Sequence, residues 1–186
     1  MKVKLHELIE DMEVIMIRHT SVDIPPGTCY GQSDVPVRDT FPQEAEQTKR
    51  NLKSYEPIDA GYCSPLTRTR MLAEYCGHPE PIFDERIKEI NFGDWEMQPP
   101  EKLYPPTPEW LEDYMNIPTP NGEDFPVFYR RVAGFLDELR TKDFRRVAVF
   151  SHGGVLLCAG LYVGMFGEKE AWNNLVGFGG IQRIEL

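Results

Sequence analysis

The sequence predicts an α/β protein in which helices cover both faces of a mostly parallel central sheet. Two short apolar runs, Val14–Ile17 and Val147–Phe150, are followed at once by polar residues, as buried parallel strands are at their carboxyl ends. Helix-like stretches alternate with such runs along the chain. At 186 residues, 41% of them hydrophobic, the chain is long enough for one domain with a substantial core.

The expected elements are short and alternate in type. Strands are predicted near residues 14–18, 60–63, 81–83, 146–151 and 178–185. Helices are predicted near residues 43–53, 66–76, 108–116, 125–140 and 154–164. Strands that alternate with helices in this way pair in parallel, because each helix returns the chain to the same end of the sheet.

A proline-rich segment interrupts this alternation. Prolines crowd residues 98–120, and we expect a cap over the site within about residues 94–124. Trp110 and Tyr114 fall on its predicted helix. They line either the core or the wall of a substrate pocket, and the core is the preferred interpretation.

Composition excludes some classes of function. The chain carries 20 basic and 30 acidic residues, a net charge of −10, which disfavours a general binder of nucleic acid or of anionic membranes. No apolar run approaches the roughly 20 residues of a membrane span, and residues 1–11 lack the core of a signal peptide. We therefore expect a cytoplasmic protein with reduced cysteines, residues 1–12 forming a leader of unassigned role.

Two basic side chains follow the first strand directly. Arg18 and His19 come after Val14–Ile17, at the carboxyl edge where open α/β sheets bind ligands. A guanidinium can grip two phosphate oxygens, and an imidazole can attack phosphorus. The pair predicts a phosphate site, although such a dyad also occurs without a chemical role.

A second histidine ends the other clear strand. His152 follows Arg146–Ser151 and precedes Gly153. A turn or core histidine is the ordinary interpretation of His152 taken alone. Two histidines at two strand tips of one small domain favour a shared site.

Two further segments supply a cation and a carboxyl group. After Ser64 and Pro65 a helix is expected to begin, with Arg68 in its first turn, where a cation opposes the helix dipole and so indicates a role other than helix stability. We expect Arg68 to point inward and Arg70 to face solvent. Glu89 precedes an aromatic loop, and an apolar wall beside a carboxyl group favours its protonated, proton-donating form.

Together these motifs resemble the histidine phosphatase superfamily, also called the phosphoglycerate mutase-like family. The four motifs follow one another in the family's order over residues 14 to about 160. They are Arg18-His19-Thr20, Ser64-x-Leu66-x-Arg68, Glu89-x-x-Phe92-Gly93-x-Trp95-Glu96 and Ser151-His152-Gly153. The resemblance implies a three-layer α/β/α domain and a phosphatase that uses neither a cofactor nor a metal ion.

The resemblance also implies a role for each matching residue. His19 would take the phosphoryl group, Arg18, Arg68 and His152 would surround its oxygens, and Glu89 would protonate the leaving oxygen and then activate water. A neutral His19 is required, and the neighbouring cations lower its pKa. His152 would tend toward imidazolium beside bound phosphate. Thr20, Gln32 and the backbone of Gly153 are further expected contacts to substrate.

One branch of the family matches more of the chain. The stretch from Pro26 to Pro36, with Cys29-Tyr30-Gly31-Gln32, resembles the α-ribazole phosphatases. These enzymes remove the 5′-phosphate of α-ribazole phosphate during assembly of the cobalamin nucleotide loop. Three departures lie at the expected pocket rim and weaken the substrate assignment: Pro25-Pro26, Met97 after Trp95-Glu96, and Asn121-Gly122-Glu123-Asp124.

Alternatives stay open at this point. A phosphoglycerate mutase or a broad sugar phosphatase would use the same scaffold, although mutases generally need a longer chain. A phosphate-binding regulatory module without turnover is an alternative of another class. The expected partner is a small phosphate ester, with neither nucleic acid nor membrane; the oligomeric state is open, a homodimer being one option.

Overall fold

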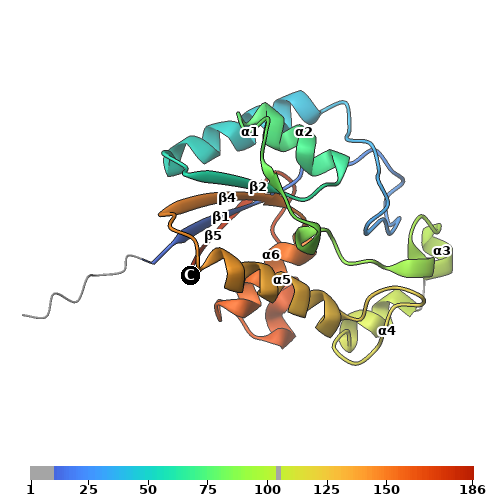
Figure 1. Ribbon diagram of the computed structural model, residues 1–186. Helices are drawn as coiled ribbons and strands as arrows, with labels where there is room; N and C mark the ends of the chain where they lie inside the picture. The colour runs from blue at the N-terminus through green and yellow to red at the C-terminus, as the bar shows by residue number, and fades with distance from the viewer. Residues whose placement is uncertain (1–10, 104–105) are drawn as a thin grey trace, which may run out of the picture.

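The computed structural model describes residues 11–103 and 106–186, which form an α/β fold around a five-stranded sheet (Figure 1). The strand order is β3-β2-β4-β1-β5. The strands are β1 (Glu13–Arg18), β2 (Ala60–Cys63), β3 (Ile82–Phe83), β4 (Arg146–Ser151) and β5 (Ile181–Glu185). The predicted fold class is confirmed.

Pairing in the sheet is parallel except at one edge. β1 pairs with β4, β4 with β2 and β2 with β3, all in parallel, whereas β5 pairs antiparallel with β1. The last strand starts at Ile181 and not at residue 178 as predicted, so Phe178 lies in the loop before it. The glycines at 177, 179 and 180 explain the late start, because glycine is a poor strand former.

The helices cover both faces of the sheet, as Figure 1 shows. α1 and α2 lie on one face, and α5 and α6 lie on the other. Ile15 and Phe150 belong to the core on the α1–α2 side, and Val14 and Val149 to the core on the α5–α6 side. The helices are α1 (Phe41–Leu52), α2 (Thr67–Tyr75), α3 (Pro100–Leu103), α4 (Pro106–Glu112), α5 (Phe125–Leu139) and α6 (Gly153–Tyr162).

Helix starts follow local chemistry. The Asp124 carboxylate accepts a hydrogen bond from the Val127 N–H at 2.6 Å, and Pro126 occupies the first turn of α5, where a missing N–H costs nothing. α2 begins at Thr67, two residues after Pro65, and Asp34 from a distant loop accepts bonds from the Thr67 N–H and hydroxyl. The long loop that follows β1 thus helps to fix the start of α2.

The proline-rich segment contains two short helices and not one. α3 was not predicted, and α4 ends at Glu112, short of the predicted end at residue 116. Trp110 is 2% exposed and packs edge-on against Trp172 and Phe92, with Tyr114 beside it. The preferred interpretation of these aromatics as core is therefore confirmed.

The two ends of the described chain pair with each other. The backbone of Met12 exchanges two hydrogen bonds with Leu186, at 3.1 and 3.0 Å. Met12 is also buried, so this residue packs with the fold; residues 1–10 of the predicted leader lie outside the described part. Among the residues described, no helix is long and apolar enough to cross a membrane.

Candidate active site

The two strand-tip histidines lie side by side. β1 and β4 are neighbours with Arg18 opposite Ser151, so the next residue on each strand is His19 and His152. The His19 N–H donates to the Ser151 carbonyl at 3.0 Å, and the two imidazole centroids are 5.3 Å apart. Both rings are buried, at 1% and 0% exposure. Strand pairing thus builds the centre of the candidate site.

His19 is held in the tautomer that a nucleophile needs. Its Nδ1 lies 2.7 Å from the Thr20 carbonyl oxygen. A carbonyl can only accept, so Nδ1 carries the proton and the lone pair lies on Nε2. Burial, with the charges of Arg68 and Arg18, holds the pKa of His19 well below its usual value, although the bond to Thr20 opposes this shift. The ring is therefore neutral at pH 7.

Arg68 is a fully buried cation on the second residue of α2. Its Nη1 donates to the Ser33 carbonyl at 2.9 Å and its Nη2 to the Gly31 carbonyl at 2.6 Å. Its Nε–H is buried and has no hydrogen-bond partner within the described chain. Arg70 is exposed and lies over the Phe83 ring, so the inward orientation predicted for Arg68 is confirmed.

Arg18 is fixed by the loop that precedes β5. Its Nη1 donates to the Val176 carbonyl, and its guanidinium carbon lies 4.1 Å from the centre of the Phe178 ring. Its Nε–H is buried and finds no partner among residues 11–103 and 106–186. The Phe178 ring also lies 5.6 Å from the His19 ring and is 46% exposed, so it borders the site at the surface.

His152 caps the start of α6 and contacts a serine. Its Nε2 lies 2.7 Å from the Ser64 hydroxyl, while its Nδ1 is buried and unpartnered in the part of the chain described. Burial, Arg68 and His19 together hold the pKa of His152 well below its usual value. His152 is thus neutral in the free protein, and its charging beside phosphate stays a prediction.

Glu89 contributes a half-buried carboxylate beside α6. One oxygen accepts the Ile90 N–H at 3.0 Å, and the other accepts the Gly154 N–H at 3.1 Å. A Cβ at position 154 would lie only 2.3 Å from Glu89 Oε1. Glycine at this position therefore lets the carboxylate approach the helix that begins next to His152.

The three expected substrate contacts lie in different settings. Thr20 is fully buried, and its hydroxyl has no partner among the described residues. The Gln32 amide donates to the Glu89 carbonyl at 3.0 Å, so this side chain already holds the backbone of the loop. Gly153 is the first residue of α6, where a Cβ would lie 3.1 Å from the guanidinium carbon of Arg18.

The unpartnered polar groups converge on one kind of ligand. The Nε–H of Arg18, the Nε–H of Arg68 and the Nδ1 of His152 are buried without a partner in the described chain, and they belong to the two arginines whose charges act on His19 and to the histidine beside it. Leaving buried donors unsatisfied costs about 1–3 kcal/mol each, more for charged groups. An anion with several acceptor oxygens would satisfy them together, and a tetrahedral phosphoryl group is such an anion.

Sequence reasoning assigned no role to several residues that form the site. Phe178 stacks on Arg18 although 160 positions separate them, and its only signal is an aromatic residue set among glycines before the last strand. Glu96 accepts N–H bonds from Gln32, Ser33 and Phe92, which joins the two loops on either side of the site. Burial raises the pKa of Cys29 to about 12, with Glu96 and Glu89 adding to the shift, which favours the protonated thiol over the nucleophilic thiolate.

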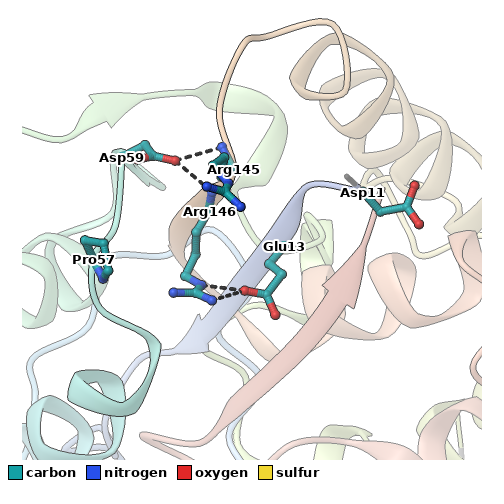
Figure 2. Close-up of a pocket in the computed structure, with 6 residues that line it drawn as sticks. All are labelled: Asp11, Glu13, Pro57, Asp59, Arg145 and Arg146. Atoms are coloured by element: carbon teal, nitrogen blue, oxygen red, sulfur yellow. Dashed lines mark hydrogen bonds and ion pairs between the residues drawn. The ribbon is translucent and has the colours of Figure 1, made fainter. Parts of the chain in front are cut away.

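A charged hollow lies at the opposite end of the strands (Figure 2). Its volume is about 410 Å³, and it includes Glu13 and Arg146, the first residues of β1 and β4. Arg146 pairs with Glu13, and Asp59 accepts the N–H groups of residues 145 and 146. Its lining carries three carboxylates and two guanidinium groups and includes none of His19, Arg68 or His152, so it is not the site built around His19.

Comparison with known families decides the identity. Residues 14–186 match the family described as histidine phosphatase superfamily (branch 1). The chain belongs to this superfamily. The match spans all four motifs and nearly the whole of the sheet, so the predicted family is confirmed, and the comparisons support phosphatase activity.

Relatives within the histidine phosphatase superfamily carry different names. The adenosylcobalamin/alpha-ribazole phosphatase of Salmonella typhimurium is 31% identical over 78% of this chain and 76% of that protein. Phosphoserine phosphatase 1 of Hydrogenobacter thermophilus is 31% identical over 76% of this chain and 71% of its own. The crystal structure of a phosphoglycerate mutase from Thermus thermophilus superposes with a TM-score of 0.76, at 28% identity over 93% of this chain and 92% of that chain.

Proposed function

We propose that this histidine phosphatase is a phosphomonoesterase that works through a phosphohistidine on His19. The supporting observation is the geometry of that ring: Nδ1–H is bonded to the Thr20 carbonyl, the lone pair lies on Nε2, and burial keeps the imidazole neutral. A neutral imidazole with a fixed lone pair is a competent nucleophile. Arg18 and Arg68 supply the fixed positive charge on which phosphoryl transfer mainly depends.

In the first step His19 takes the phosphoryl group. The Nε2 lone pair forms a bond to phosphorus as the bond from phosphorus to the ester oxygen breaks. The electron pair of that bond stays on the leaving oxygen, which takes the proton of the Glu89 carboxyl group. The products are phosphohistidine, a free alcohol and the Glu89 carboxylate.

In the second step water releases the phosphate. The Glu89 carboxylate takes a proton from water, whose oxygen attacks phosphorus as the bond to Nε2 breaks. The electron pair returns to the imidazole, which is again neutral, and Glu89 is again protonated. One ester and one water have become one alcohol and one inorganic phosphate.

The substrate that we propose is α-ribazole 5′-phosphate, in assembly of the cobalamin nucleotide loop. The Salmonella typhimurium relative supports it by name, and so does the Tyr30-Gly31-Gln32 loop. The aromatic residues beside His19 support it chemically, since the rings of Tyr30 and Phe178 lie 6.3 and 5.6 Å from the His19 ring. Two aromatic walls suit a leaving group that carries an aromatic base.

Small carboxylated esters are the competing substrates. Phosphoserine and phosphoglycerate occur in the names of two relatives, and each carries a carboxylate that calls for a cation beyond those on the phosphate. Among the described residues, the arginines that lower the pKa of His19 or His152 are Arg18, Arg68 and Arg131. Arg131 is bonded to Glu123 and to backbone carbonyls, which leaves the other two for phosphate.

Phosphate release tests both levels of the proposal. α-Ribazole 5′-phosphate, 3-phosphoglycerate and p-nitrophenyl phosphate are compared in the presence of EDTA. A kcat/KM above roughly 10⁴ M⁻¹s⁻¹ for the ribazole ester, far above the other two, supports reaction class and substrate together. Comparable slow rates on all three support phosphatase activity but exclude α-ribazole 5′-phosphate as the preferred substrate. Absence of release from all three overturns the proposal in favour of a binding module.

A further inference from the structure

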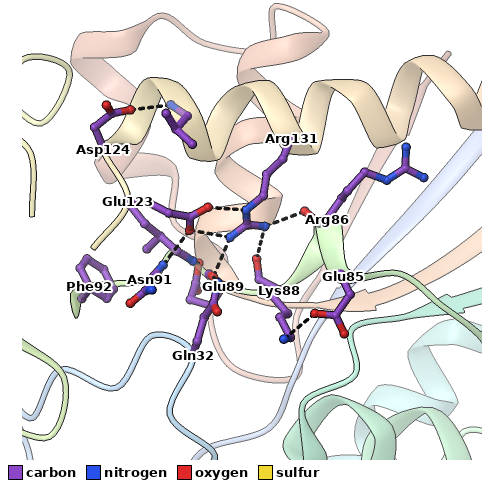
Figure 3. A network of polar contacts seen from close by, with 12 residues as sticks. Gln32, Glu85, Arg86, Lys88, Glu89, Asn91, Phe92, Glu123, Asp124 and Arg131 are labelled. Carbon is purple, nitrogen blue, oxygen red and sulfur yellow. Dashed lines mark hydrogen bonds and ion pairs between the residues drawn. The ribbon is translucent and has the colours of Figure 1, made fainter. Parts of the chain in front are cut away.

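Arg131 on α5 makes three of the hydrogen bonds that hold the loop carrying Glu89. This loop has no regular structure after the short 3₁₀ turn Glu85–Ile87, so its backbone groups have no ladder or helix partners of their own. Its conformation therefore depends on bonds from elsewhere. Figure 3 shows those bonds converging on Arg131.

All five N–H groups of Arg131 are used. Nη1 donates to the carbonyls of Arg86 and Lys88 at 2.6 and 2.7 Å, and Nη2 donates to the carbonyl of Glu89 at 2.8 Å. Nε and Nη2 also grip the two oxygens of Glu123 at 2.7 and 2.8 Å. The planar guanidinium matches this set of acceptors, whereas a lysine ammonium has only three donors.

The same network fixes the loop on its far side. Glu123 accepts the Asn91 N–H at 2.8 Å and donates its own N–H to the Asn91 carbonyl at 2.8 Å. Residues on both sides of Glu89 are thus clamped to Arg131 or to its partner. The Glu89 carboxylate extends from this clamped backbone to the Gly154 N–H beside His152.

We propose that Arg131 is a positioning residue that holds the Glu89 carboxyl group where it can donate a proton to the leaving oxygen. The inference rests on the proposed function, because it takes Glu89 as the acid. Arg131 touches no reacting atom. It acts by fixing the backbone at three nearby carbonyls, and a displacement of about 1 Å at a proton donor is enough to cost about a hundredfold in rate.

Leaving-group chemistry separates positioning from simple stabilisation. An alkoxide needs a proton to leave, whereas p-nitrophenolate does not. Arg131→Met should lower kcat/KM for α-ribazole 5′-phosphate by at least about a hundredfold, the lower range for general acid catalysis. The stopped-flow burst of p-nitrophenolate, which reports phosphorylation of His19 alone, should stay within about threefold of the parent rate.

Three further variants make the result interpretable. Glu89→Gln removes the proposed acid itself. Its effect on the alkyl ester relative to the p-nitrophenolate burst is the reference against which the Arg131 variants are compared. Arg131→Lys keeps the charge that acts on His152 but loses the fork, and should show the same selectivity to a smaller degree. Glu123→Gln weakens the clamp while leaving the arginine in place, and covers the case in which Arg131→Met does not fold.

A matched control comes from the same region. Arg86 also ties the loop to α5, through Glu138 and the Gly134 carbonyl, and it pairs with Asp84 on its own segment; no bond joins its side chain to the Glu89 backbone in the described chain. Arg86→Met should lower the Tm and leave the ratio of the two rates unchanged. Equal slowing of both substrates by Arg131→Met, or a selectivity shared by Arg86→Met, overturns the inference.

The outcomes also separate this inference from the proposed function. If Glu89→Gln is selective and the Arg131 and Glu123 variants are not, Arg131 is only structural and the role of Glu89 stands. If Glu89→Gln slows both substrates equally, Glu89 is not the acid, and the inference about Arg131 falls with it.

Discussion

Mild acid should destabilise this protein, because two histidines are buried without charge. The perturbation is a change from pH 7.5 to pH 5.5. His19 and His152 are 1% and 0% exposed, and burial with the nearby arginines holds the pKa of each well below its usual value. In the unfolded chain both titrate at about pH 6.5.

The sign and size of the effect follow from this difference. Below about pH 6.5 the unfolded chain binds protons that the folded protein does not, so the free energy of unfolding falls as pH falls toward the folded-state pKa values. At pH 5.5 a histidine that stays neutral in the folded protein costs at most about 1.4 kcal/mol, so the pair costs at most about 2.8 kcal/mol, against almost nothing at pH 7.5. For a chain of this size that upper limit corresponds to a Tm lower by up to about 6–11 °C.

Thermal unfolding at the two pH values measures the effect. The double variant His19→Asn/His152→Asn should lose most of the pH dependence, whatever its Tm at pH 7.5. His78, half-buried with a lowered pKa, leaves a smaller residual dependence. A parent protein with the same Tm at both pH values, or a double variant with the full dependence, would refute the argument that His19 is neutral because it is buried.

Three further predictions concern turnover. His19→Ala should abolish phosphate release while inorganic phosphate still raises the Tm, since Arg18 and Arg68 remain; near-normal release would exclude a phosphohistidine. Phe178→Ala should lower kcat/KM for α-ribazole 5′-phosphate about fivefold more than for glycerol phosphate, the value of one aromatic contact, whereas Phe178→Tyr should not. Gly154→Ala, whose Cβ would lie 2.3 Å from Glu89 Oε1, should slow alkyl esters about a hundredfold and spare the p-nitrophenolate burst; equal slowing would contradict it.

The central residues of the site can be predicted from the sequence, because they directly follow the ends of two strands. His19 and His152 follow the two most apolar strands, and neighbouring parallel strands must end at the same edge. Arg68 is readable for a different reason, since a cation in the first turn of a helix is unfavourable without another purpose. The direction of the His19 pKa shift was also predicted, although burial contributes more to it than the cations do.

The sequence does not predict the side chains that hold the loops of the site by hydrogen bonds to backbone carbonyls. Arg131 bonds to three carbonyls, and every residue has a carbonyl, so no residue type marks its partners. Gln32 illustrates the same limit. Its amide was predicted to contact substrate but donates to the Glu89 carbonyl, and only the three-dimensional path of both loops reveals that bond. Its role toward substrate stays a prediction.

The backbone properties of proline and glycine account for the remaining errors in the predicted helix and strand boundaries. Prolines start short helices at Pro100 and Pro106, where one helix near residues 108–116 was predicted. The glycine-rich loop delays β5 and thereby leaves Phe178 able to stack on Arg18. In both places a backbone property outweighs the side-chain pattern.

The pairing of Arg18 with Ser151 has a consequence for how this scaffold can change. Because the two histidines follow directly on paired strands, their separation is set by the spacing of strands in a sheet, about 4.8 Å, and not by any loop. Tyr30, Phe178 and most of the proline-rich segment lie outside the sheet. Substitutions at these positions can therefore change what surrounds the two histidines while the spacing between them is kept.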